Sequence, residues 1–100
     1  MNIEEQVKQF LNEECEKYKN ITDEENHNQT QRPYYNKRIH NDFESFIEPI
    51  SNEIIKIDDE TMLQLEHYTA KLGAEFKCKF LGQVFHHAFW FTFDMCPFDK

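Results

Sequence analysis

The chain has 100 residues and a formal net charge of −8, with 19 acidic and 11 basic side chains. This length predicts one domain over residues 1–100. An acidic surface disfavours direct binding to nucleic acid or to an anionic membrane, and it favours a basic protein partner. The ten phenylalanines predict a core built from aromatic side chains.

The negative charge is concentrated in two stretches. Residues 1–30 carry eight acidic and three basic side chains, and residues 41–60 carry seven and one. Arg32, Lys37 and Arg38 lie between them beside two tyrosines, a mixture found in nucleic-acid-binding grooves. Because this basic segment is short and flanked by acidic residues, we expect it to pair with the neighbouring helices instead.

Apolar residues near the N-terminus recur at the spacing of an α-helix. Ile3, Val7, Phe10, Leu11 and Tyr18 form one stripe, and acidic residues occupy the opposite face. This pattern predicts an amphipathic helix over about residues 2–19 with an acidic outer surface.

The middle of the chain gives mixed signals. Residues 34–39 contain Tyr and Ile side chains that favour strands, and we expect an extended segment there that could form a third strand. Asn41 and Glu44 have the spacing of a capping pair, which predicts that a helix begins at this point. Apolar residues then follow helical spacing to Ile57, interrupted by Pro49. We expect either a kink at Pro49 or a second helix with Pro49 in its first turn.

The next helix is the most clearly marked in the chain. Acidic residues at 58–60 suit a helix N-terminus, and Met62, Leu65 and Leu72 lie on one helical face. Gly73 follows directly and is a natural C-terminal stop. We therefore expect a helix over about residues 59–72.

The last quarter of the chain shows alternation instead. Apolar side chains occupy every second position in residues 76–80 and again in residues 85–93, where His87 replaces one of them, and Gly82 lies between the two runs. A period of two is typical of a strand with one apolar face. We therefore predict a C-terminal antiparallel hairpin and an α+β fold, with three or four helices packed on it.

No pattern of residues indicates a catalytic site. Cys96 with His86 or His87 and Asp94 has the residue types for nucleophilic catalysis, but the aromatic residues beside them make a flat wall and not a cleft, and the chain has only two glycines to shape an oxyanion loop. We expect no enzymatic activity and no cofactor. A small-ligand or metal-binding module at Cys78, His87 and Cys96 is an alternative, although no Cys-x-x-Cys pair is present.

Three cysteines, no signal-peptide pattern and no long apolar run predict a cytoplasmic protein with reduced thiols. Trp90 falls on the hairpin face opposite the phenylalanines. It is either a core residue covered by helix 2–19 or an exposed contact residue.

These observations favour a non-enzymatic interaction module. We expect an inhibitor or immunity type of protein that occupies a basic, nucleic-acid-binding surface of a partner, with a composition like that of phage-encoded antagonists of host defence. A structural homo-oligomer, such as a homodimer joined through strand 84–93, is a further alternative. The predicted contact residues are exposed acids and one aromatic: Glu13, Glu16, Glu44, Glu48, Glu53, Asp58, Asp59, Glu60 and Trp90.

Overall fold

The computed structural model describes residues 2–24 and 31–94, and every regular element in these ranges is helical. The predicted α+β fold is therefore wrong, since these ranges contain no strand. In chain order the elements are α1 (Ile3–Tyr18), α2 (Gln31–Ile47), the 3-10 segment η1 (Glu48–Ile50), α3 (Ser51–Ile54), α4 (Asp59–Gly73), α5 (Lys79–Phe89) and the π-helical segment η2 (Trp90–Asp94).

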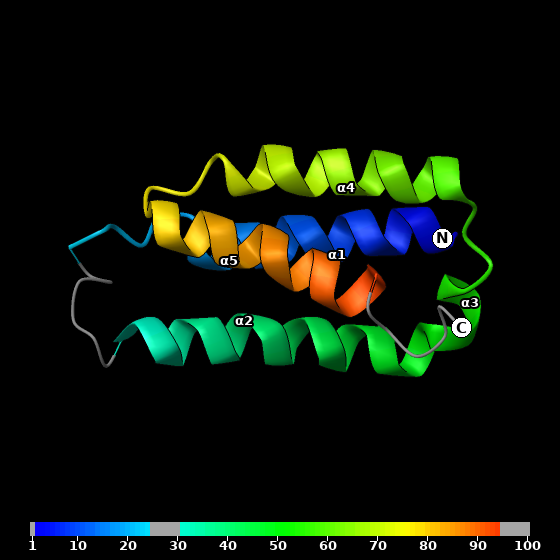
Figure 1. The fold of residues 1–100 in the computed structure, drawn as a ribbon, viewed down its shortest axis with the longest axis horizontal. Helices are drawn as coiled ribbons and strands as arrows, with labels where there is room; N and C mark the ends of the chain where they lie inside the picture. The colour runs from blue at the N-terminus through cyan, green and yellow to red at the C-terminus, as the bar shows by residue number, and fades with distance from the viewer. Residues whose placement is uncertain (1, 25–30, 95–100) are drawn as a thin grey trace.

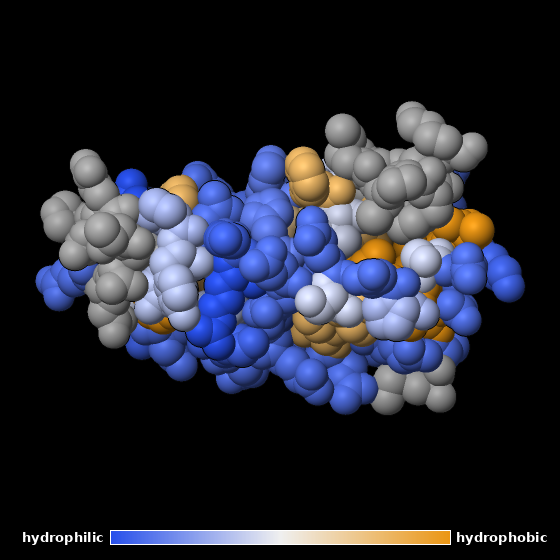
Figure 2. Space-filling model, turned by 90° about the horizontal axis from the view of Figure 1, so that it is seen from below, coloured by the Kyte–Doolittle hydropathy of each residue, from blue (hydrophilic) through white to orange (hydrophobic). Residues whose placement is uncertain are grey.

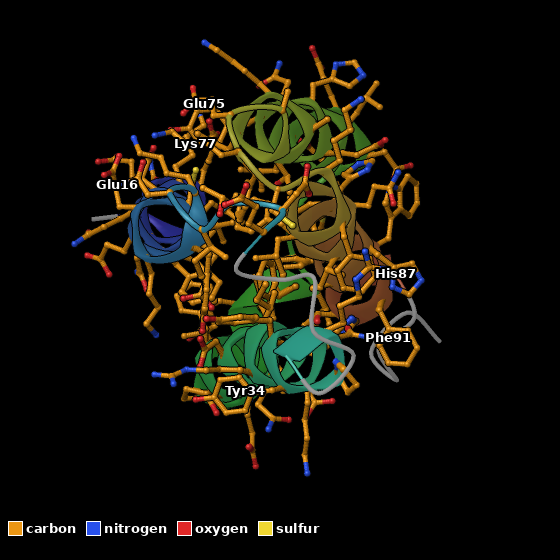
Figure 3. The ribbon with its side chains drawn as sticks, turned by 90° about the vertical axis from the view of Figure 1, so that its left-hand side faces the viewer. Glu16, Tyr34, Glu75, Lys77, His87 and Phe91 are labelled. Carbon is orange, nitrogen blue, oxygen red and sulfur yellow. The ribbon has the colours of Figure 1, made fainter. Side chains whose placement is uncertain are left out.

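The four long helices form a bundle. Seen along its length, α4 and α2 lie at opposite sides, with α1 and α5 between them on the left and right (Figure 3). Close packing joins α4 to α5, α1 to α4 and α2 to α5. Because α2 and α4 are on opposite sides, the chain between them, including η1 and α3, crosses the end of the bundle (Figure 1).

The predictions of helices over residues 2–19 and 59–72 are confirmed by α1 and α4. Each begins at a capping side chain: Asn2 accepts a hydrogen bond from the Glu5 backbone N–H at 2.8 Å, and Asp58 accepts one from that of Thr61 at 2.7 Å. Such caps satisfy donors that the first helical turn leaves unpaired. Both helices bury the apolar stripe that their sequences show.

The extended segment predicted at residues 34–39 is wrong, because this range lies inside α2. Ile39, Phe43 and Ile47 recur every four residues and are all buried in the core, so helical packing overrides the strand preference of Tyr and Ile. Pro33 is tolerated because it is the third residue of the helix, where no intrahelical bond is lost. Asn41 consequently lies within the helix and does not begin it.

The regular helix α2 ends before Pro49, which agrees with the predicted alternative of a new helical segment with Pro49 in its first turn. Pro49 lies in the first turn of η1, and α3 continues directly after that segment. The side chain of Ile54 on α3 is 1% exposed, so this short crossing also contributes to the core. On its outer side Ile55 is half exposed. Viewed from the α2 side, the bundle is mostly hydrophilic, and hydrophobic residues gather toward the end where α3 lies (Figure 2).

The predicted hairpin over residues 76–80 and 84–93 is also wrong, since α5 and η2 occupy most of this region. The buried side chains follow a helical pattern: Leu81, Phe85, Ala88 and Phe89. Phenylalanines at 85, 89 and 93 are four residues apart, and this spacing fits alternation as well as a helical face. The intervening aromatic, Phe91, is 50% exposed. Alternation alone therefore could not distinguish the two structures.

The two glycines of the chain meet where α4 and α5 cross. A Cβ atom built on Gly82 would lie 2.5 Å from the carbonyl oxygen of Gly73, and one built on Gly73 would lie 3.0 Å from that of Gly82. Neither glycine has a positive φ. The hairpin prediction puts Gly82 in a turn, which is wrong, whereas α4 does end at Gly73 as predicted. In the structure both glycines allow the backbones of α4 and α5 to approach each other closely.

Aromatic side chains fill the centre of the bundle, as the composition predicts. Phe85 is fully buried and packs against Phe43 of α2 at 5.5 Å and Phe76 at 5.4 Å between ring centroids. The buried residues form one cluster drawn from α1, α2, α3, α4 and α5. This core fixes the surface positions of the remaining side chains.

Candidate functional site

A pocket of about 170 Å³ lies between the beginning of α4 and the end of α5. It brings together two of the residues predicted from the sequence, Asp59 and Trp90. Its described lining residues are Asp59, Met62, Leu63, Glu66, Phe89, Trp90 and Phe93.

Helix α4 supplies one wall of this pocket. Asp59, Met62, Leu63 and Glu66 lie three or four residues apart, so they share one face of the helix. The cap by Asp58 sets where α4 begins and thereby sets the position of Asp59. The carboxylate of Asp58 accepts hydrogen bonds from the Thr61 backbone and side chain, and these lower the pKa of Asp58. Asp58 therefore has a structural role in this helix.

The other wall comes from the junction of α5 and η2. Phe89 and Phe93 are almost fully buried and stack with centroids 4.6 Å apart and an interplanar angle of 19°, so they form an apolar floor. Trp90 stands beside them at the first position of η2. Its indole N–H donates a hydrogen bond to Nε2 of His86 at 3.2 Å, which orients the ring.

The pocket combines exposed apolar surface with negative charge. Trp90 is 39% exposed and Leu63 is 51% exposed. Asp59 and Glu66 place two carboxylates at the same pocket, and no basic side chain is among its described lining residues. The sequence left open whether Trp90 is covered by helix 2–19 or exposed. In the structure Trp90 is exposed, and the helix beside it is α4. A pocket of this kind suits a group that is apolar along its length and positive at its end.

The other predicted carboxylates do not join this pocket. They are exposed and belong to different elements: Glu13 and Glu16 to α1, Glu44 to α2, Glu48 to η1, Glu53 to α3, and Asp58 and Glu60 to the start of α4. Glu16 is paired with Lys19 at 2.5 Å, and it lies on the side of the bundle away from His87 and Phe91 (Figure 3). The predicted acidic contact residues are therefore spread over five elements, and Asp59 is the one of them among the described lining residues of this pocket.

Sequence reasoning missed Met62, Leu63, Glu66, Phe89 and Phe93 as pocket residues. The helical spacing from Asp59 to Glu66 was visible in the sequence and could have placed one exposed leucine between two acids. The contribution of Phe89 and Phe93 could not be found, because the predicted hairpin put Trp90 on the face opposite these rings.

The fold does not bring together Cys78 and His87, two residues of the alternative metal or ligand site. Cys78 is the N-cap of α5 and His87 lies near the end of that helix, so they are nine positions, or about 13.5 Å, apart along the helix axis. The Cys78 thiol is buried and accepts a hydrogen bond from the Leu81 backbone N–H at 3.5 Å. Cys96 lies outside the described residues. Within residues 2–24 and 31–94, no three His, Cys, Asp or Glu side chains are grouped as metal ligands would be.

His87 has a different neighbourhood from the one predicted. Its ring lies 5.6 Å from that of His40 on α2, and Phe91 lies 5.8 Å from the same His40 ring. Both His87 and Phe91 point outward from the bundle (Figure 3). Burial and the nearby His87 lower the pKa of His40. The residues expected to form strand 84–93 are helical, so a homodimer by strand pairing has no strand to use.

No family model, no curated protein and no solved structure matches this chain. Among the helices described, none has the length and apolar character needed to span a membrane.

Proposed function

We propose that this protein is a non-enzymatic interaction module that binds a basic, amphipathic segment of a partner protein at the pocket between α4 and α5. A single observation carries the proposal: Asp59 and Glu66 flank a half-exposed Leu63 and an exposed Trp90. Tryptophan beside an apolar pocket is a frequent centre of binding energy in protein interfaces. The two carboxylates select a partner that carries Lys or Arg next to its apolar side chains.

The net charge of −8 supports this role in a second way. The exposed acids on α1, α2 and α3 do not form the contact, but their long-range field attracts a basic partner and speeds its approach. The carboxylates in the pocket then fix its orientation. Occupying a basic surface in this way would make the protein an inhibitor of whatever that surface binds, such as a nucleic acid.

The same charges disfavour a homodimer through this pocket. Two copies facing each other would bring two Asp59 and two Glu66 carboxylates together without a described basic residue between them. Like charges placed in this way oppose association. We therefore expect the binding face to select a different protein. Sedimentation velocity at micromolar concentration tests this expectation. A dimer of the parent protein that becomes a monomer in the Leu63→Glu variant would show self-association through this pocket and would contradict it.

Trp90 is the single tryptophan of the chain, so its fluorescence reports directly on the pocket. The test is a titration with a synthetic amphipathic helix of Lys and Leu residues at low and high salt. We expect a saturable blue shift of the emission, and an affinity that falls at least tenfold between 20 and 300 mM salt, roughly as charge screening predicts. An affinity indifferent to salt would contradict the electrostatic part of the proposal.

Charge-neutral variants make this test specific. The double variant Asp59→Asn with Glu66→Gln removes the two pocket carboxylates. Glu44→Gln with Glu53→Gln removes the same charge from exposed positions on α2 and α3 and serves as the matched control. We expect the first pair to lose most of the affinity and the second to change it less than threefold. Equal losses in both would show that the chain acts only through its net charge.

A further inference from the structure

A second pocket, of about 410 Å³, opens in the seam between α1 and α2. The backbones of these two helices make few close contacts, so side chains bridge the seam. The stacked rings of Phe10 and Phe46 lie at this pocket with centroids 4.3 Å apart. The residues lining it are Phe10, Glu13, Glu14, Lys17, Asp42, Ser45 and Phe46.

Glu14 has an unusual place among these residues. Its side chain is only 5% exposed, although carboxylates are rarely buried without a partner. Its Oε1 lies 3.6 Å from the Lys17 ammonium, whereas its Oε2 is buried and has no hydrogen-bond partner among the described residues. Such an orphaned oxygen is costly to bury, so it calls for a proton or a positive group beside it.

Asp42 of α2 faces Glu14 across the seam. Its Oδ2 accepts hydrogen bonds from the Tyr18 hydroxyl at 3.0 Å and from the Lys17 ammonium at 3.2 Å. Burial, followed by the hydrogen bond and the negative charge of Asp42, raises the pKa of Glu14 to about 8. Partial burial acts against ionisation of Asp42, but its hydrogen bonds from Glu14, Lys17 and Tyr18 lower its pKa overall. At neutral pH the pair therefore holds one proton, on Glu14.

A proton is the smallest cation that can satisfy this pair. A guanidinium group is larger and fits the rest of the pocket better, because its planar N–H groups can donate to two carboxylates while its face lies on an aromatic ring. Phe10 and Phe46 supply such rings, and Glu13 adds a further negative charge at the rim. Lys17 is 46% exposed, so its ammonium can move toward solvent when another cation enters.

We propose that the α1–α2 pocket binds a guanidinium group, which takes the place of the proton between Glu14 and Asp42. Glu14 enters the reaction as a carboxylic acid and ends as a carboxylate paired with the guanidinium, and its proton goes to solvent. Binding is therefore linked to the release of one proton. This site is separate from the α4–α5 pocket and does not depend on the function proposed for it.

The proton release sets the pH dependence. The other charged or titratable groups around the pair are Glu13, Lys17 and Tyr18 on α1 and Arg38 on α2. Burial and the charge of Asp42 raise the pKa of Tyr18, so the tyrosine stays neutral. Only Glu14 then loses a proton on binding. We expect affinity to rise about tenfold per pH unit below pH 8 and to level off above it.

The probe is N-acetyl-L-argininamide, added to ¹⁵N-labelled protein at pH 6.5, 7.5 and 8.5 and followed by NMR. We expect saturable shifts at the backbone amides of Lys17 and Ser45, with a dissociation constant that falls as pH rises. N-acetyl-L-lysinamide, which lacks the planar fork, is expected to bind at least fivefold more weakly. A short peptide carrying one arginine forms the second arm, and tighter binding of the peptide would assign the natural guanidinium to a polypeptide.

Glu14→Gln is the decisive variant, since its amide can still donate to Asp42 but cannot become negative. Glu16→Gln changes an exposed neighbour on the same helix and is the matched control. We expect Glu14→Gln to abolish binding with an unchanged fold, and Glu16→Gln to keep it. Equal binding by both variants, an affinity independent of pH, or no saturable shift at 100 mM probe would overturn the proposal. The double variant Asp59→Asn with Glu66→Gln should retain arginine binding, so the two sites are tested separately.

Discussion

Replacing Gly82 by alanine is the most direct test of how α4 and α5 pack. In an isolated helix this change is favourable by about 1 kcal/mol, because glycine is a poor helix former. In the bundle the new Cβ would lie 2.5 Å from the carbonyl oxygen of Gly73, whereas ordinary contacts of a Cβ are 3.4–4 Å. The obstructing atom belongs to a backbone, so no change of side-chain rotamer relieves the clash.

The helices must therefore separate by about 1 Å at their closest point. Forcing an extra carbon into a packed interface costs about 1–3 kcal/mol, and the rigid backbone contact places this substitution near the upper end. After subtraction of the gain in helix propensity, we expect Gly82→Ala to lower the free energy of unfolding by about 2 kcal/mol. Gly73→Ala should cost less, because its Cβ would lie 3.0 Å from the Gly82 carbonyl oxygen.

Urea unfolding followed by circular dichroism measures these differences. Gln83→Ala is the matched control, since Gln83 is the exposed neighbour of Gly82 on the same helix, and we expect it to change stability by less than about 0.5 kcal/mol. A Gly82→Ala protein as stable as the parent, or more stable, would refute the close crossing of α4 and α5.

Three further predictions follow from the core and from the buried carboxyl. Phe85→Ala should lower the free energy of unfolding by about 3–5 kcal/mol in the same assay, because the Phe85 side chain is fully buried in the core; a loss below about 1 kcal/mol would contradict its central place. The pKa of Glu14 is raised from 4.5 to about 8 in the folded state, so stability should fall as pH rises from about 4.5 to 8. The Glu14 side chain is only 5% exposed, so we expect this loss to be on the order of 3 kcal/mol. Glu14→Gln should remove it from a series of urea curves at different pH; an unchanged slope would contradict the assignment. Burial raises the pKa of Cys15 to about 11 and also raises that of Cys78. In a Cys96→Ser variant we therefore expect both thiols of the folded protein to react with a disulfide reagent at least a hundredfold more slowly than the same thiols in urea. Rapid reaction of the folded protein would count against their burial.

The sequence was sufficient for α1 and α4 because each has a cap, an apolar stripe and a polar face that agree. It was misleading after residue 75 because Phe85, Phe89 and Phe93 satisfy alternation and helical spacing together. Ala88 was the residue that could have decided, since with Leu81 and Phe85 it completes a helical face and has little reason to sit in a strand. A single glycine between the two runs was also a weak turn signal.

The prediction of an extended segment at residues 34–39 was wrong for a related reason. Tyr and Ile have strand preferences when they are considered locally, but Ile39 shares its face with Phe43 and Ile47, and burial of that face decides the structure. In the candidate site, Trp90 and Asp59 could be chosen from residue type and charge. Leu63 and Glu66 could not be joined to them without knowing that α4 and α5 pack side by side.

The pairing of the Glu14 and Asp42 carboxyl groups could not be predicted from the sequence. They are 28 positions apart, on helices whose relative placement depends on the whole bundle. The sequence does place Glu14 on the apolar face of α1, three residues after Leu11 and four before Tyr18, which distinguishes it from Glu13 and Glu16. It does not show that Asp42 lies opposite.

A basic, amphipathic segment should bind between α4 and α5 and not wherever the surface is acidic. The sharpest test is a map of NMR chemical-shift changes on adding the Lys and Leu peptide at 100 mM salt. We expect the largest changes at the Trp90 indole N–H and at the amides of Leu63 and Glu66, with small ones on α1. Changes spread evenly over the acidic residues of α1, α2 and α3, with Trp90 unaffected, would contradict it.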